Sequence, residues 1–325
     1  MDVNLKIPAI EQLLKMIASG IGAVGGPMLA RWKAQAEADA LRIEAQGKAD
    51  SMFLIADAQA KAHESLSVIP PSTHGAIDIR NEIQARLSFQ EEKRQGNIES
   101  VVGMAADELG EKQVQAHDVD HDWTARFFAD VQDVSSEKMQ QIWAKILAGE
   151  VETPGRTSMQ TLSILRNMSQ RDAELFERIA NFVIDDFVLD DDSTESVSGF
   201  PNYNDFMRLS HHNLIHLSAG GLQRILKGSP EYHFDNGDTV YRIHKGGTEI
   251  YNAEIPSHAL TPSGKELYAF INCRTNEDYL GVLAEFLKKR AGGRLAYAQI
   301  LDRIGPEYRI GPWIEVEPRI PSKQK

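Results

Sequence analysis

A long alanine-rich stretch near the start of the chain constrains the fold more than any other feature of the sequence. Residues 31–66 contain almost no helix breakers, and small or apolar residues recur there every three or four positions. These residues are Ala34, Ala38, Leu41, Ala45, Ala49, Met52, Ala56 and Ala60. The spacing predicts a helix that packs along one seam, either on a second copy or on the central part of its own chain. Because alanine buries little apolar surface, we expect residues 1–66 to be an amphipathic and alanine-rich segment that acts in assembly.

Residues 1–30 predict an amphipathic helix that does not cross a membrane. Apolar residues recur at helical spacing until Gly25, Gly26 and Pro27 break or kink the pattern. The longest uncharged stretch, residues 16–30, is shorter than the ~20 apolar residues of a spanning helix, which leaves peripheral contact with a membrane surface open. Residues 20–25 spell GxGxxG, but a helix precedes them and no βαβ unit follows. They therefore predict close helix packing rather than dinucleotide binding.

Charge is distributed unevenly along the chain. Residues 1–204 hold 19 Lys+Arg and 33 Asp+Glu, a net of −14, whereas residues 205–325 hold 16 and 14, a net of +2. An acidic body repels nucleic acid, so nucleic acid as a partner would need a local patch on the C-terminal part. The single cysteine, Cys273, excludes a disulfide within the chain and indicates a reducing, cytoplasmic location.

The pattern of breakers and periodicity predicts a mainly α protein built in segments. After the N-terminal segment we expect a linker at residues 67–74, a central helical domain at 75–185 and an acidic flexible linker at 186–204. Residues 205–325 predict a winged-helix-like α+β module. Its first part, residues 206–226, has a helical pattern, and Asp235-Asn236-Gly237 is a hairpin turn signal.

Local capping signals predict where several helices start. Ser169 with Asp172 three residues later forms a capping box. Thr261-Pro262 places a hydroxyl at an N-cap and a proline at the first helical position. Another helix is expected after Ser135, with an apolar face formed by Met139, Ile142, Trp143, Ile146 and Leu147.

The cluster from His117 to Asp122 is the strongest candidate for chemistry. If it lies on a helix, His117 and His121 share a face at i,i+4, the spacing that lets two imidazoles bind one divalent metal ion. Asp122 and Arg126 would then complete a metal-dependent nuclease of the RNase type, with Arg126 stabilising developing charge. The structural alternative is that this Asp-rich segment caps a helix whose buried face carries Trp123, Phe127 and Val131.

Basic residues of the C-terminal module offer a second candidate site. Arg224, Lys227, Arg242 and Lys245, together with residues 288–290, could bind the phosphates of nucleic acid if they converge on one face. Winged-helix modules also act as adaptors between proteins. The module is nearly neutral, which favours a protein partner over nucleic acid.

Several runs resemble a known family. They are Ser19-Gly20-Ile21-Gly22 with residues 26–30, Asp120-His121-Asp122-Trp123-Thr124-Ala125-Arg126-Phe127-Phe128, Val134-Ser135-Ser136-Glu137 through residues 143–150, and Pro154-Gly155 with Thr161-Leu162. In these runs the chain resembles a bacterial family of domains of unknown function, family 2806. The resemblance implies a bacterial origin and a gene of the kind found beside phage-defence loci. It implies no catalytic residue, substrate or cofactor.

The leading hypothesis from the sequence is an oligomeric interaction protein, a sensor, adaptor or effector in bacterial antiviral defence, with a protein partner. It rests on the alanine seam and on the lack of a complete catalytic set. The alternative is the metal-dependent nuclease built on His117, His121 and Asp122. The sequence does not decide whether the protein is an enzyme.

Overall fold

The structure is a computed structural model of the chain. It describes residues 7–21, 75–110, 112, 114–115, 117–217, 222–236, 238–245, 251–271, 275–304 and 307–319. The alanine seam and the linker expected at 67–74 lie outside the described residues. Among the helices that the structure describes, none is long and apolar enough to cross a membrane.

The chain divides into two compact units. One unit comprises Met1–Ser135 and Leu147–Pro154, and the other comprises Ser136–Ile146 and Gly155–Lys325. Helix α6 (Glu137–Glu152) therefore contributes its first part to the second unit and its last turns to the first unit.

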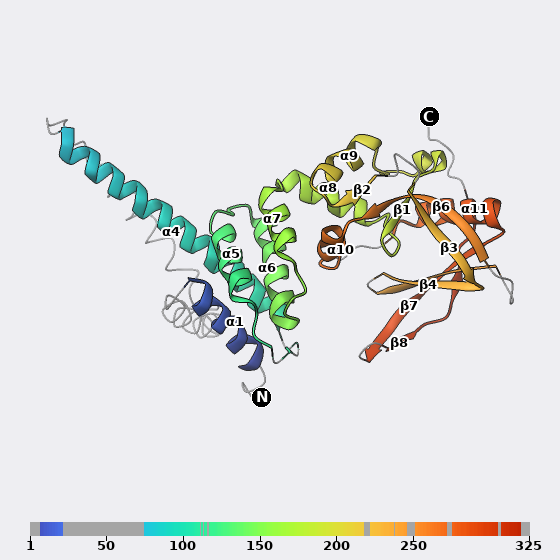
Figure 1. Cartoon of the computed structure of the whole chain (residues 1–325), viewed down its shortest axis with the longest axis horizontal. Helices are drawn as coiled ribbons and strands as arrows, with labels where there is room; N and C mark the ends of the chain where they lie inside the picture. Colours follow the sequence, from blue (N-terminus) through green and yellow to red (C-terminus); the bar gives the residue numbers. More distant parts are fainter. Residues whose placement is uncertain are drawn as a thin grey trace, which may run out of the picture. The chain divides into compact units, whose positions relative to one another are not determined.

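The first unit is helical. It contains α1 (Ile7–Ile21), α4 (Gly75–Leu109), α5 (His121–Val131) and the last turns of α6 (Figure 1). Helix α1 packs very closely on α5 at Gly20. A Cβ atom at this position would lie only 2.4 Å from Cδ2 of Phe128. Leu13, Ile17 and Phe127 are each at most 1% exposed and lie in this core. The close helix packing expected around Gly20 is thus what the structure has.

The second unit holds the remaining helices. They are α7 (Met159–Asn167), α8 (Gln170–Ala180), the 3-10 helix η2 (Asp192–Ser196), α9 (Tyr203–His211), α10 (Pro262–Tyr268) and α11 (Glu277–Ala291). The predicted capping box is present at α8, where Ser169 and Asp172 bond each other's backbone N–H. Thr261 caps α10 as predicted, by accepting from the backbone N–H of Gly264 at 3.0 Å. Short-range capping therefore sets these helix starts.

Two antiparallel sheets complete the second unit. Their strands are β1 (Phe187–Leu189), β2 (Ile215–His216), β3 (Gln223–Ser229), β4 (Glu231–Asn236), β5 (Thr239–His244), β6 (Tyr251–Leu260), β7 (Arg294–Ile304), β8 (Glu307–Ile310) and β9 (Ile314–Glu315). One sheet has the order β1-β6-β2, with β3 also on β6; the other has the order β4-β5-β7-β8, with β9 on β7. Helix α11 packs on β6 and β7, one strand from each sheet.

The core of the second unit gathers aromatic rings around α11. Tyr279 is fully buried, and its hydroxyl oxygen accepts a hydrogen bond from the backbone N–H of Leu189 in β1 at 2.8 Å. Its ring lies 5.6 Å from the ring of Phe182 and 6.0 Å from that of Phe200. These contacts fix α11 against β1 and the segments on either side of it.

The expectation of a mainly α protein is wrong. Of the described residues, 55% are helical and 21% lie in strands, so the fold is mixed α+β. The expected winged helix is not confirmed, because two antiparallel sheets occupy the place of a single hairpin wing. Ala, Gln, Leu and Arg make up most of β7, and these residues favour helix when neighbours are ignored. Pairing with β5 and β8 overrides that local preference.

Two neighbouring expectations also differ from the structure. The helical pattern at 206–226 ends early, since α9 stops at His211 and Asn213 adopts a φ of 54°, which no helix continues. For residues 186–204 we expected a flexible linker. They instead form β1, which is fully buried, and the 3-10 helix η2, whose N-cap is Asp191. The acidic run is used for capping, which a charge count does not reveal.

Candidate interaction site

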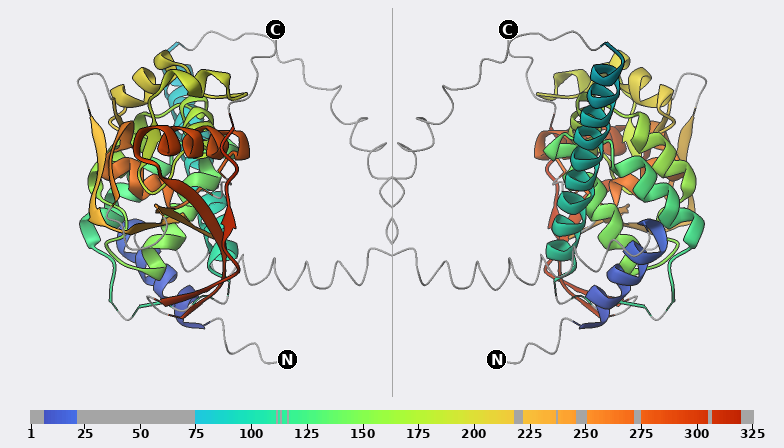
Figure 2. Two further views of the ribbon diagram at one scale, coloured as in Figure 1. Left: turned by 90° about the vertical axis from the view of Figure 1, so that its right-hand side faces the viewer. Right: turned by 90° about the vertical axis from the view of Figure 1, so that its left-hand side faces the viewer.

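Helix α4 is half buried and half exposed. Its C-terminal half carries Val101, Val102, Ala105 and Leu109, all 0% exposed, and contacts α5 and α1. Every residue from 81 to 92 is exposed. Figure 1 shows this N-terminal half extending beyond α1 and α5, and Figure 2 shows α4 as one continuous helix.

The exposed half carries an apolar stripe. Ile79, Ile83 and Leu87 follow at i, i+4 and i+8 and are 58%, 42% and 49% exposed. Eighteen residues make five helical turns, so Ile83 lies directly in line with Val101 and Leu87 with Ala105. We call Ile79, Ile83 and Leu87 the α4 stripe. The α4 stripe lies on the same face of the helix as the residues that the C-terminal half buries in the core. Among the described residues, no segment covers the stripe.

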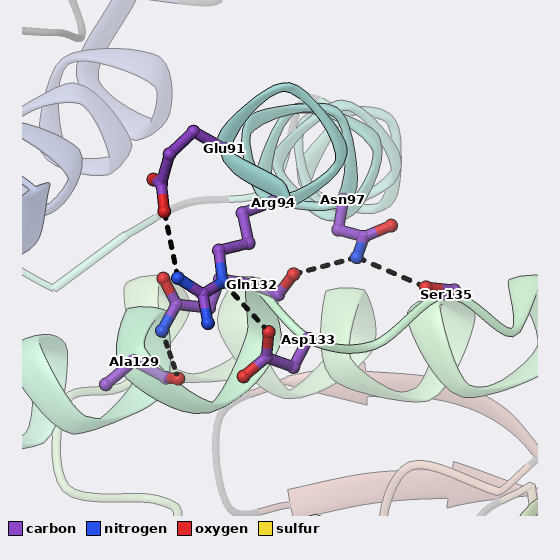
Figure 3. Close-up of polar contacts among 7 residues, drawn as sticks. All are labelled: Glu91, Arg94, Asn97, Ala129, Gln132, Asp133 and Ser135. Atoms are coloured by element: carbon purple, nitrogen blue, oxygen red, sulfur yellow. Dashed lines mark hydrogen bonds and ion pairs between the residues drawn. The ribbon is translucent and has the colours of Figure 1, made fainter. Parts of the chain in front are cut away.

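A polar cluster marks the point where α4 leaves the core (Figure 3). The amide of Asn97, 8% exposed, donates to the backbone oxygen of Gln132 at 2.7 Å and to Oγ of Ser135 at 3.4 Å. The guanidinium of Arg94 donates from Nε to Asp133 at 3.1 Å and from Nη1 to Glu91 at 2.9 Å. These bonds tie the middle of α4 to the turn after α5.

The cluster orients helix α4 more than it stabilises the fold. The Arg94 and Asp133 side chains are 38% and 64% exposed, and solvent screens ion pairs at such exposed sites, so they add little stability. The hydrogen bond to Asp133, then that to Glu91, raises the pKa of Arg94 above its ordinary value, so the guanidinium stays charged. Because three hydrogen bonds from Asn97 and Arg94 reach one turn, they fix the direction in which the α4 stripe projects from the unit.

The predicted metal site is not assembled as expected. His117 lies in the loop before α5, which begins at His121, so the two imidazoles do not share a helical face. His121, Asp122 and Arg126 are exposed. Among the described residues, no group of three or more His, Cys, Asp or Glu side chains is placed to hold a metal ion.

The segment serves instead as a helix start. Asp120 is the N-cap of α5, and its carboxylate accepts from the backbone N–H of Trp123 at 2.8 Å. Trp123, Phe127 and Val131 form the buried face of the helix. The structure therefore has the capping arrangement that the sequence offered as the alternative.

The four basic residues of the second candidate site have different surroundings. Arg224 donates to Asp186 at 2.9 Å and pairs with Asp185, so two carboxylates already neutralise it. Arg242 lies 4.4 Å above the ring of Trp313 and 3.5 Å from Glu315. Lys245 follows β5, and its Cε would be 3.7 Å from a Cβ atom at Gly292. Lys227 is exposed on β3.

The α4 stripe was not singled out from the sequence, although its spacing is visible there. Apolar residues at helical spacing recur later in the helix at Ile98, Val101 and Ala105, so the sequence does not show which half of the helix faces a core. Only the positions of α1 and α5 reveal the exposed half.

Comparison with known proteins gives one finding. A family model described as a protein of unknown function (DUF2806) matches residues 81–284, which is 204 of the 325 residues. No curated protein and no solved structure matches the chain. The match begins within the exposed half of α4 and extends into α11. Because it covers more than half of the chain, this protein belongs to the DUF2806 family.

Proposed function

We propose that this protein is an interaction protein that assembles with a second copy of itself through the α4 stripe. The observation that carries the proposal is the row of half-exposed aliphatic side chains at Ile79, Ile83 and Leu87 on a helix that leaves the core. Contiguous apolar surface of this kind typically marks a site of protein association. A cytoplasmic location and a role in antiviral defence stay predictions from the sequence.

The charges beside the stripe favour an antiparallel copy as the partner. Glu82 and Arg86 are exposed and lie on the same flank of α4, one turn apart. In an antiparallel pair, this flank of one copy lies against the same flank of the other copy. Because the two helices run in opposite directions, Glu82 of each copy lies opposite Arg86 of the other. Each ion pair then forms twice, as a two-fold interface requires.

The expected affinity is modest. Fully burying an Ile or Leu side chain contributes about 1.5–3 kcal/mol, so covering the exposed half of six such side chains contributes roughly 6 kcal/mol. Association costs about 4 kcal/mol or more in lost freedom. The surplus over that cost is about 2 kcal/mol, and about 5 kcal/mol at the upper end of the burial range, so the stripe alone supports a weak dimer with a Kd of roughly 0.2 mM or higher.

Light scattering across a concentration series tests the proposal. We expect the mean mass of the full chain to rise with concentration toward twice the monomer mass, and Ile83→Asp to raise the Kd at least about tenfold because it buries a charge in the interface. Ser88→Asp is the matched control, since Ser88 lies on the opposite face of the same exposed turn. Equal association by both variants and the wild type would exclude the stripe as the interface.

Mixing two charge variants tests the antiparallel arrangement. Glu82→Arg and Arg86→Glu each place like charges opposite one another, so each variant alone is expected to associate more weakly than the wild type. In an equimolar mixture the opposite charges meet again, and association recovers. A mixture no stronger than its components contradicts the antiparallel pairing.

A further inference from the structure

A second surface, in the other unit, has the form of a binding groove. A hollow of about 700 Å³ lies beside β3 and β6 at the end of α11; Figure 1 shows these three elements close together. Ile225, Pro256 and Phe286 give it apolar walls. Its volume is within the range of about 300–1,000 Å³ that is usual for ligand sites.

The fold brings two distant basic residues to this hollow. Lys227 comes from β3 and Arg290 from the last turn of α11, and both are exposed. The guanidinium of Arg290 lies 5.8 Å from the ring centre of Phe286, which holds the charge over the apolar wall. Glu254 is the one acidic residue of the lining, so the net charge of the hollow is positive and an acidic ligand is favoured.

Strand β3 gives the hollow a direction. Among the described strands, β3 pairs with β6 and with no other, so its second edge is not covered by any strand that the structure describes. Gln223, Ile225 and Lys227 alternate along it and line the hollow, and Ile225 is 61% exposed. An extended chain added at this edge would meet an apolar side chain and then a cationic one, two residues apart.

We propose that this hollow binds an extended, acidic segment of a partner protein, which adds to the edge of β3. An apolar residue of the bound segment contacts Ile225, and an Asp or Glu two residues further along the segment pairs with Lys227 and Arg290. Single-stranded nucleic acid fits less well, because the one aromatic ring of the lining, Phe286, is 6% exposed and offers no surface on which bases stack. The site is separate from the α4 stripe, so either proposal stands or fails alone.

Selection from a random eight-residue peptide display library on the immobilised full-length protein tests this inference. We expect enriched peptides in which aliphatic residues alternate with Asp or Glu. The double variant Lys227→Glu/Arg290→Glu should lose the acidic enrichment, and a fluorescent copy of the best acidic peptide should bind it at least tenfold more weakly.

The control is Lys288→Glu/Lys289→Glu, which makes the same charge change on α11 outside the hollow. Thermal unfolding confirms that both double variants are folded. Three results would overturn the proposal: no enrichment on the wild type, the same acidic enrichment on the Lys227 and Arg290 variant, or displacement of the peptide by an oligothymidine at equal concentration.

Discussion

Asp172 ties α8 to α9, and its replacement allows a quantitative test of the second unit. The Asp172 side chain is 5% exposed. Oδ2 accepts from the backbone N–H of Ser169 at 2.9 Å and from its hydroxyl at 2.6 Å, while Oδ1 accepts from Arg208 in α9. Nε2 of His212 lies 3.5 Å from Oδ2. One carboxylate therefore serves as both a helix cap and an interhelical ion pair.

The pKa of Asp172 sets the size of the effect. Burial alone would raise it, but the bonds from Arg208 and Ser169 outweigh burial and lower the pKa from 3.8 to about 2. At about 1.4 kcal/mol per pKa unit, the ionised carboxylate contributes roughly 2 kcal/mol at pH 7. We expect Asp172→Asn to lower the free energy of unfolding by about that amount.

The sign of the pH dependence follows from the direction of the shift. Because the folded-state pKa is depressed, the contribution is fully present above pH 3.8, the ordinary value, and is lost as the pH falls toward 2. In urea unfolding, the difference between wild type and Asp172→Asn should shrink to roughly half by pH 3. Asp118→Asn, at an exposed position of the first unit, should change stability by less than about 0.5 kcal/mol. A difference that is the same at pH 7 and pH 3 would refute the reasoning.

Three further substitutions test the packing. Gly264→Ala should destabilise the protein by about 1–3 kcal/mol in urea unfolding, because its Cβ would lie 2.1 Å from the backbone oxygen of Leu214; unchanged stability would show that this contact is not tight. Tyr279→Phe should cost about 1–3 kcal/mol, since the buried N–H of Leu189 loses its acceptor, and a neutral result would mean that this N–H finds another partner. Gly20→Val should speed proteolysis of the first unit by separating α1 from α5, and a cleavage rate equal to that of the wild type would contradict this.

The parts of the fold that the sequence predicts correctly depend on neighbouring residues. The capping box of Ser169 and Asp172 and the cap at Thr261 involve positions three residues apart, so a short motif determines them. The family resemblance is also confirmed, because the matched residues include the quoted runs from Asp120 to Leu162.

The parts that the sequence does not predict depend on distant residues. β6 pairs with β1, β2 and β3, which lie on both sides of it in space but all precede it in the chain. Lys227 and Arg290 are 63 positions apart and line one hollow only after α11 packs on β6. The i,i+4 spacing of His117 and His121 suggested a shared face, but α5 starts too late for both to lie on it.

Disulfide cross-linking at position 83 tests the central claim most directly. In a background of Cys273→Ser, Ile83→Cys places a thiol at the middle of the α4 stripe, where a two-fold interface brings position 83 of one copy near position 83 of the other. Under mild oxidation we predict a covalent dimer for Ile83→Cys and far less for Ser88→Cys on the opposite face. Equal cross-linking at the two positions, or none at position 83, would contradict assembly through the α4 stripe.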